Sequence, residues 1–224
     1  MRSIMLCGFD MSGFPISIGR RERKSRGVYA ANVLLIILLI ILVWEMMFVS
    51  RYTRVYVVGD SMLPTLQGAQ DKTQAGGDFL YADTHATAEN GDIIVISAHD
   101  EFGEEKVIIK RQIAFEGQTV QLVRGVLYID GEMVEEPYVV AENNTASLPV
   151  NTYGPVTVPE GCVFVMGDNR DVSSDSRSKY GMIDTEDIIG VVAPWSLALK
   201  GFITSWNTFF EYTVPAIFSG CGAR

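Results

Sequence analysis

The stretch 57–66 carries a serine that could act as a nucleophile. An apolar run ends at Gly59 and Asp60, so that Ser61 lies on a turn. Pro64 restricts the backbone three residues later, which places the hydroxyl group on a shaped loop and not inside a strand. A serine in this setting is more often a turn or helix cap, so a nucleophile also requires a base elsewhere in the chain.

Lys110 is the best candidate for that base. The two histidines, His85 and His99, lie in polar loops and are expected to be surface residues. Lys110 instead follows the apolar residues 107–109 within a predicted strand, and it lies on the opposite strand face from Arg111. If one face is core, one of these two cations must point away from bulk water, and we expect it to be Lys110.

Burial would make this lysine useful as a base near neutral pH. It disfavours the ammonium form, and lowering the pKa of Lys110 from about 10.4 to about 8 would cost about 3.3 kcal/mol. A domain with a real core can tolerate such a cost. The alternative is a lysine that packs its stem against apolar surface and keeps its amine in water.

The polar stretch 167–177 follows a predicted buried strand directly. A calcium loop starting at Asp171 is excluded, because Ser176 stands where glycine is needed and Met182 where the bidentate glutamate should be. We expect a hydrogen-bonded loop with an ion pair between Asp175 and Arg177 that forms a wall of the site. The alternative is a solvated charged turn. No sequence motif for a metal, nucleotide or other cofactor is present.

Composition and charge narrow the class of protein. The chain has 224 residues, and residues 51–224 carry 12 Lys or Arg against 24 Asp or Glu. An acidic domain without a basic stripe disfavours nucleic acid as a partner. The cysteines Cys7, Cys162 and Cys221 lack the spacing of a zinc site. We expect Cys162 to be a buried small hydrophobic residue, with a Cys162–Cys221 disulfide as the alternative.

The N-terminal part predicts a membrane anchor. Residues 28–49 form an apolar run interrupted only by Asn32 and Glu45, and a helix of that length reaches about 33 Å, enough for a hydrocarbon core of about 30 Å. The basic residues in 20–26 place the preceding end in the cytoplasm. A cleavable signal peptide is the alternative, but no small-residue cleavage site follows. We therefore expect a cytoplasmic tail at 1–27, a transmembrane anchor at 28–50 and an extracytoplasmic catalytic domain at 51–224.

The extracytoplasmic part is predicted to be mainly β. Short runs rich in β-branched residues alternate with turn residues, and few segments have helical periodicity. We expect antiparallel sheets that form a partly closed barrel. The predicted strands are 54–58, 78–82, 93–97, 106–114, 119–124, 126–129, 162–166 and 188–193. Residues 195–210 could form an aromatic-rich helix, and a second membrane span in the last 30 residues is not expected.

Taken together and in order, these stretches resemble type I signal peptidases, the membrane-bound Ser-Lys proteases that remove signal peptides from exported proteins. The resemblance covers residues 28–193. Besides the anchor, it is carried by four motifs, which are 59–66, 91–95, Lys110-Arg111 and 167–177. It implies a mainly β protease core, a location in the cell membrane, cleavage after small residues, no cofactor and no metal. The implied partners are signal peptides of secreted preproteins and membrane lipid.

The resemblance also implies roles for single residues. Ser61 is similar in position to the family's nucleophile, Lys110 to its general base and Ser173 to the residue that orients the lysine amine. Asp175 and Arg177 resemble the supporting ion pair. Met62 resembles the neighbour that shapes the lysine pocket.

Two departures from the family pattern and one alternative function qualify this picture. Gly59 stands where some members place an oxyanion-stabilising serine, so we expect the backbone N–H of Ser61 to donate to the oxyanion. Residues 114–118 replace a common Pro-Gly-Asp turn.

The alternative function is a catalytically silent, membrane-anchored binding domain. Labelling of Ser61 by a serine-directed acylating inhibitor would exclude this alternative.

Overall fold

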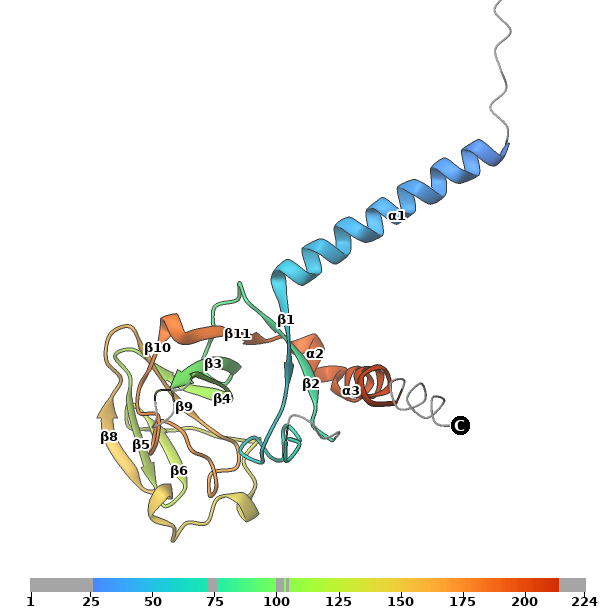
Figure 1. Ribbon diagram of the computed structural model, residues 1–224. Coiled ribbons are helices and arrows are strands. Elements are labelled where there is room, and N and C mark those ends of the chain that lie inside the picture. Colours follow the sequence, from blue (N-terminus) through green and yellow to red (C-terminus); the bar gives the residue numbers. More distant parts are fainter. Residues whose placement is uncertain (1–25, 72–75, 100–102, 104, 214–224) are drawn as a thin grey trace, which may run out of the picture. The chain divides into compact units, whose positions relative to one another are not determined.

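The computed structural model describes residues 26–71, 76–99, 103 and 105–213 (Figure 1). Residues 1–25 of the predicted cytoplasmic tail, which include Cys7, therefore lie outside the described residues. Cys221 also lies outside them. The chain divides into two compact units, Met1–Met46 and Met47–Arg224.

In the first unit, the described residues belong to the helix α1, which spans Arg26–Arg51 and continues into the second unit. Its segment Gly27–Arg51 is long and apolar enough to cross a membrane, and none of its most apolar stretch is buried in protein. The expected anchor thus corresponds to one continuous helix.

The second unit is built on a seven-stranded sheet with the order β1-β2-β11-β3-β4-β9-β10. All of its strand pairs are antiparallel. The strands are β1 (Tyr52–Tyr56), β2 (Phe79–Asp83), β3 (Ile93–His99), β4 (Glu105–Phe115), β9 (Cys162–Met166), β10 (Ile183–Asp184) and β11 (Ile188–Val192). β1 lies at one end of this order and β10 at the other, so the sheet does not close into a barrel.

A smaller antiparallel sheet has the order β7-β6-β5-β8 (Figure 1). Its strands are β5 (Thr119–Val123), β6 (Val126–Ile129), β7 (Glu132–Met133) and β8 (Tyr153–Thr157). Short 3-10 turns lie at Ala141–Asn143, Pro149–Asn151 and Thr185–Asp187. One core cluster joins β5 and β6 of this sheet to β4 and β9 of the larger one through Val120, Leu122 and Leu127 packed with Ile113 and Phe164.

The mainly β, antiparallel prediction is confirmed, with each of the eight predicted strands present and shifted by no more than two residues. Three short strands were missed: β7, β8 and β10. β8 begins inside the segment 137–155, for which the sequence predicts a polar loop or a small subdomain, and it contains Pro155. A proline removes a backbone donor and weakens the local strand signal, so only pairing with β5 defines this strand.

The segment after β11 is helical, as predicted. It forms α2 (Pro194–Ala198), α3 (Lys200–Thr208) and a π-helical turn (Phe209–Thr213). These helices lie beside β1 and β2 (Figure 1): the Phe79 backbone N–H donates to Thr204 Oγ1 at 2.9 Å and the Tyr81 N–H to Ser196 Oγ at 2.7 Å.

Candidate active site

Ser61 lies on a tight loop that follows β1. Gly59 adopts a φ of 81°, in the left-handed region that favours glycine, and its N–H donates to the Ala69 carbonyl at 2.8 Å. The loop returns so closely that a Cβ on Gly68 would lie 1.9 Å from the Gly59 carbonyl oxygen. The two glycines therefore allow the chain to fold back and present Ser61, which is half-buried.

A second loop holds the serine from the other side. The Asn169 backbone N–H donates to the Ser61 carbonyl at 3.0 Å, and the Asn169 side-chain amide donates to the Asp60 carbonyl at 3.1 Å. A Cβ on Gly167 would lie 2.4 Å from the Ser61 carbonyl oxygen. The 167–177 stretch thus forms a wall against the serine loop through its backbone as well as its side chains.

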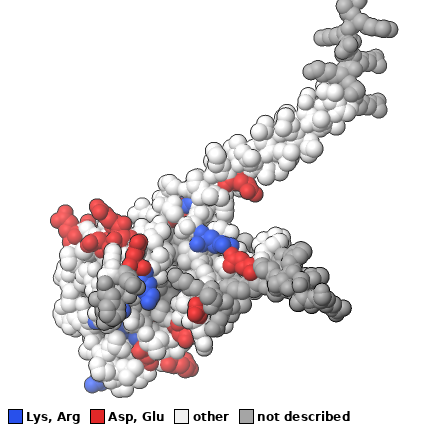
Figure 2. Space-filling view, in the orientation of Figure 1, with Lys and Arg blue, Asp and Glu red and all other residues white. Residues whose placement is uncertain are grey.

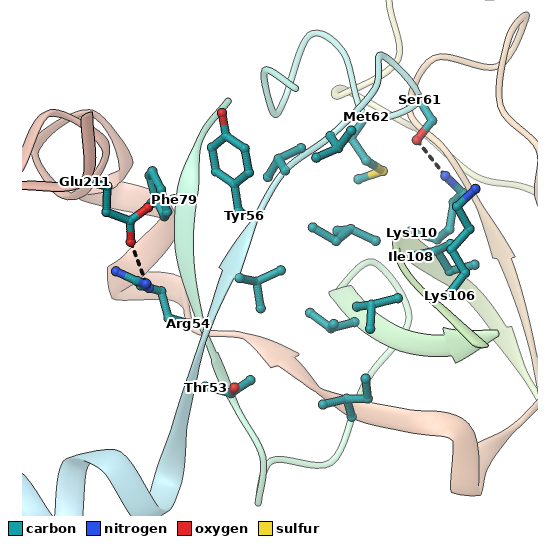
Figure 3. A pocket seen from close by; sticks show the side chains of 17 residues that line it. Thr53, Arg54, Tyr56, Ser61, Met62, Phe79, Lys106, Ile108, Lys110 and Glu211 are labelled. Atoms are coloured by element: carbon teal, nitrogen blue, oxygen red, sulfur yellow. Dashed lines mark hydrogen bonds and ion pairs between the residues drawn. The ribbon is translucent and has the colours of Figure 1, made fainter. Parts of the chain in front are cut away.

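Lys110 reaches Ser61 from β4 (Figure 3). Its Nζ donates to Ser61 Oγ at 2.6 Å, and the residue is only 5% exposed. Burial lowers the pKa of Lys110 to about 8, while the carboxylates of Asp175 and Asp168 act in the opposite direction. About a tenth of this amine is therefore unprotonated at pH 7, and about half at pH 8.

Met62 forms part of the wall behind these two residues. It is 1% exposed and belongs to the same core cluster as Val95 and Ile109 of the neighbouring strands β3 and β4. Met62 also lines the same groove as Ser61 and Lys110.

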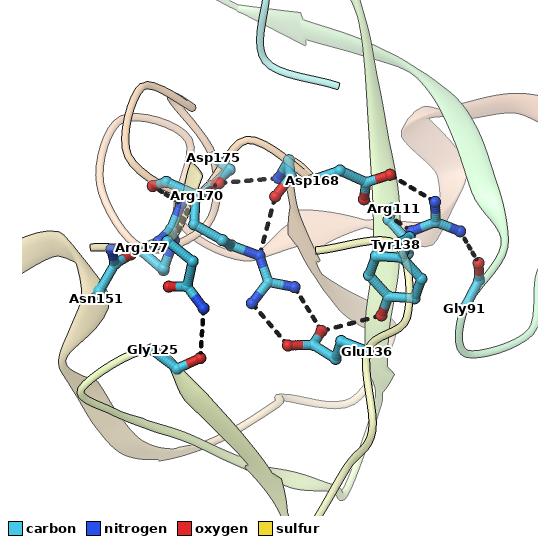
Figure 4. Close-up of polar contacts among 12 residues, drawn as sticks. Gly91, Arg111, Gly125, Glu136, Tyr138, Asn151, Asp168, Arg170, Asp175 and Arg177 are labelled. Atoms are coloured by element: carbon cyan, nitrogen blue, oxygen red, sulfur yellow. Dashed lines mark hydrogen bonds and ion pairs between the residues drawn. The ribbon is translucent and has the colours of Figure 1, made fainter. Parts of the chain in front are cut away.

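Asp175 and Arg177 form a buried ion pair at 2.8 Å (Figure 4). Asp175 also accepts the Gly167 backbone N–H at 3.0 Å, and Arg177 donates to Asn151 Oδ1 at 2.9 Å. Their charges act on Lys110 in opposite directions, since Asp175 raises its pKa and Arg177 lowers it. The pair thus shapes the loop and contributes to the field at the amine.

Ser173 occupies the same loop but makes no hydrogen bond to the amine. It is 5% exposed, and its Oγ has no hydrogen-bond partner among the described residues. Its backbone N–H donates to the Asn169 carbonyl at 3.1 Å, and its Oγ would be 2.3 Å from a Cβ placed on Gly167. Lys110 donates to Ser61 and not to Ser173, so an orienting role for Ser173 stays a prediction.

A second set of buried charges, which the sequence did not predict, lies in the same unit (Figure 4). Arg111 was expected on the face opposite Lys110, and it is also buried, at 7% exposure. It makes a bidentate ion pair with Asp168, with N···O distances of 2.8 and 2.6 Å, and its guanidinium lies 3.7 Å from the centre of the Tyr138 ring. Both adjacent cations are therefore sequestered, each on its own side of β4.

Arg170 completes this set. It is fully buried, pairs with Glu136 through both terminal nitrogens, and donates from Nε to the Gly167 carbonyl at 3.0 Å. Tyr138 donates to Glu136 at 3.0 Å, and burial raises the pKa of its hydroxyl. The only signal in the sequence was the density of polar residues in 167–177, which does not reveal partners in the 134–138 segment.

A groove with a volume of about 660 Å³ runs along Ser61 and Lys110 (Figure 3). It is lined mainly by β1 and the first half of β4, with residues from β2, β3 and β11. β1 is an end strand of the sheet, and β4 pairs with β9 only from Arg111 onwards. Both strands therefore leave an edge available next to the candidate nucleophile.

The other sequence candidates lie outside this site. His85 and His99 are exposed, as expected. Cys162 is half-buried rather than buried, because it begins β9 at the sheet margin; its free thiol donates to Asp184 at 3.3 Å. Within the described part of the chain, no group of three or more His, Cys, Asp or Glu is placed to hold a metal ion.

A candidate nucleophile and a candidate base therefore meet on a mainly β scaffold, which is the pairing that a serine peptidase requires. The sequence model described as "Signal peptidase, peptidase S26" matches residues 28–196, and the chain belongs to this family of hydrolases.

Curated relatives and a solved structure carry the same name. The chain is 40% identical over 143 residues to signal peptidase I of Bacillus licheniformis, covering 60% of this chain and 70% of that protein. It is 33% identical over 175 residues to signal peptidase I S of Bacillus subtilis strain 168, covering 75% and 88%. A crystal structure of a signal peptidase I from Enterococcus faecalis V583 is 30% identical, covers 48% of this chain and 98% of that one, and has a TM-score of 0.40.

Proposed function

We propose that this protein is a Ser-Lys endopeptidase that removes signal peptides from exported preproteins at the outer face of the cytoplasmic membrane and cleaves after small residues. The observation that carries the proposal is the 2.6 Å contact between Lys110 Nζ and Ser61 Oγ in a setting that lowers the lysine pKa to about 8. A lysine with an ordinary pKa would be almost fully protonated and could not serve as a base.

The chemistry follows from this pair. The neutral Lys110 amine takes the Ser61 proton while Oγ bonds to the carbonyl carbon of the scissile peptide, and the carbonyl oxygen becomes an oxyanion. The backbone N–H of Ser61 donates to that oxyanion. The Lys110 ammonium then protonates the leaving amine as the C–N bond breaks, which leaves an acyl-enzyme. Lys110 next takes a proton from a water molecule as its oxygen attacks the ester carbon, and it returns that proton to Ser61 Oγ as the C–Oγ bond breaks and the product leaves as a carboxylic acid.

The groove suits an extended peptide. The free edge of β1 and the unpaired half of β4 offer backbone donors and acceptors on both sides of it, which is the arrangement used in strand addition. Aliphatic residues such as Val95 and Ile108 line its interior beside Ser61. A hydrophobic pocket discriminates by about 1–3 kcal/mol per methylene, so Leu at the last and third-last positions of a signal peptide should block cleavage of a substrate that has small residues there.

The proposed topology places the N-terminus in the cytoplasm and the catalytic unit outside. Its basis is α1, which is long enough to span, together with the basic residues that precede it in the sequence. Protease added to cells stripped of their wall should digest the catalytic unit. Protection of that unit would contradict the topology.

The proposal as a whole is tested by kcat/KM of the full chain in detergent on one signal-peptide substrate. Ser61→Ala and Lys110→Ala should each remove nearly all activity, and the double variant should be little worse because the two residues act as a unit. Lys110→Arg should also fail, since a guanidinium cannot be deprotonated to act as a base. Substantial activity in Lys110→Arg would contradict the Ser-Lys mechanism.

A further inference from the structure

The loop that carries Ser61 ends in a short helical turn. We call residues 59–68 the serine loop. In its second half the Leu66 N–H donates to the Met62 carbonyl at 2.9 Å. As at any helix end, the last carbonyl groups of such a turn have no partner within the turn itself. The second half of the serine loop therefore depends on partners from elsewhere in the chain.

Lys200, the first residue of α3, supplies such a partner. Its Nζ donates to the Thr65 carbonyl at 2.6 Å and lies 3.3 Å from Asp78 Oδ2. The same Asp78 oxygen accepts the Gln67 N–H at 2.9 Å. The lysine side chain is 34% exposed and that of Asp78 13%, so these contacts are partly shielded from water. One cation thus joins the end of the serine loop to the residue that precedes β2.

The helix α3 is fixed to the larger sheet by contacts that do not involve Lys200. The Phe79 N–H of β2 donates to Thr204 Oγ1 at 2.9 Å, and Arg54 of β1 donates to Asn207 Oδ1 at 2.8 Å. The strands β1 and β2 belong to the same sheet as β4, which carries the candidate base. Lys200 therefore reaches the serine loop from an element that is held on the same scaffold as that base.

The residue type at position 200 also indicates a tertiary role. A cation in the first turn of a helix is disfavoured by the helix dipole, which favours acidic side chains there. Residues 51–224 carry 24 Asp or Glu against 12 Lys or Arg, and the face drawn in Figure 2 shows more acidic than basic surface. A lysine with only a solvated role would find exposed carboxylates on such a surface. Lys200 instead donates to a backbone carbonyl of the serine loop.

We propose that Lys200 is a positioning residue for the peptidase reaction, which holds the serine loop so that Ser61 Oγ stays within reach of Lys110. This inference rests on the proposed function, because it takes Ser61 as the nucleophile. Asn169 holds the Ser61 carbonyl, and Lys200 holds the opposite end of the loop. Residue 200 lies beyond the 28–196 stretch that matches the family, so this support comes from outside the matched motifs.

The contact should affect the catalytic step and not substrate binding. The groove beside Ser61 is lined by β1 and β4 and includes neither Thr65 nor Lys200. Loss of the contact leaves these strands in place but allows the serine loop to shift. A displacement of about 1 Å at a reacting atom can lower a rate by about 100-fold. We therefore expect kcat to fall while KM changes little.

Kinetics of the full chain in detergent test this role. In Lys200→Met, which keeps the apolar stem and removes the donor, kcat on a signal-peptide substrate should fall about 10- to 100-fold, with KM within about twofold of the wild type. The rate is expressed per Ser61 that a serine-directed inhibitor acylates at the end point, so that unfolded molecules do not count. Lys200→Arg should recover most of kcat, because a guanidinium can also donate to the Thr65 carbonyl. Arg124→Met, which removes an exposed cation in the turn between β5 and β6, is the matched control and should change neither constant.

A second variant tests whether Asp78 acts through Lys200. Asp78→Asn keeps an acceptor for the Gln67 N–H and removes the charge beside the lysine. Its kcat should fall less than that of Lys200→Met, and the double variant should be no worse than Lys200→Met alone. Three results would overturn the proposal: additive losses in the double variant, an unchanged kcat per acylated serine in Lys200→Met, or a rise in KM without a fall in kcat.

Hydrogen exchange of the serine loop gives a readout that does not depend on activity. The amides of residues 62–68 should exchange faster in Lys200→Met than in the wild type, while those of β5 and β6 should be unchanged. Equal exchange of the loop in both proteins would also overturn the proposal. Failure of the proposed function is distinct, since the wild type itself would then neither cleave the signal peptide nor react with the inhibitor at Ser61.

Discussion

Replacing Lys110 by Met should abolish catalysis and yet stabilise the folded protein near pH 7. Burial lowers the pKa of Lys110 from 10.5 to about 8, a difference of about 2.5 pKa units. This difference measures how strongly the folded protein disfavours the protonated amine at pH 7. At 1.36 kcal/mol for each pKa unit, this amounts to about 3 kcal/mol. The variant also loses the hydrogen bond from Lys110 to Ser61, which contributes about 1 kcal/mol to stability. The free energy of unfolding should therefore rise by about 2 kcal/mol in the variant.

The size of this gain depends on pH in a defined direction. The folded protein releases the Lys110 proton near pH 8, whereas the unfolded chain keeps it until about pH 10.5. Between these values the unfolded chain binds more protons, so the stability of the wild type rises with pH. The Met variant lacks this contribution. Its advantage should therefore be fully present below about pH 8 and lost by about pH 10.5.

Thermal unfolding of the full chain in detergent, followed by near-UV circular dichroism from pH 7 to 10.5, measures the effect beside a peptide cleavage assay. Lys106→Met is the control for stability, because Lys106 lies on the same strand face but is exposed; its unfolding temperature should stay close to that of the wild type. Two results would refute the reasoning: activity in Lys110→Met, or a variant less stable than the wild type at pH 7.

Three further predictions concern the base, the serine loop and the buried charges. The kcat/KM of the wild type should rise about tenfold per pH unit below about pH 8 and level off above it, because only neutral Lys110 is a base; a flat profile between pH 6 and 8 would contradict this role. Gly68→Ala should reduce activity strongly, since its Cβ would lie 1.9 Å from the Gly59 carbonyl oxygen, whereas Gly201→Ala in α3, with no atom within 4 Å, should leave peptide cleavage unchanged. Glu136→Gln should destabilise the fold by about 3–5 kcal/mol by leaving buried Arg170 without its ion pair; an unfolding temperature equal to that of the exposed control Glu142→Gln would show that the pair contributes little.

The amino-acid sequence determined the features that depend on local patterns. Short runs rich in β-branched residues between turn residues located the main strands, and the long apolar run located α1. The position of Lys110 within an apolar strand singled it out over the two histidines, because a lysine in such a strand must have a buried or half-buried stem. Composition alone could also disfavour nucleic acid as a partner, since charge is a sum over residues.

Only the tertiary structure decided which residues meet. Ser61 and Lys110 are 49 residues apart in the chain, and their 2.6 Å contact depends on the loop after β1 folding back over β4. Arg111 could be buried only because Asp168 and Tyr138 lie opposite it, and Arg170 only because Glu136 does. Such pairs depend on strand register and loop docking, which no local spacing records. The same holds for Ser173, whose hydroxyl has no hydrogen-bond partner among the described residues, which its motif could not reveal.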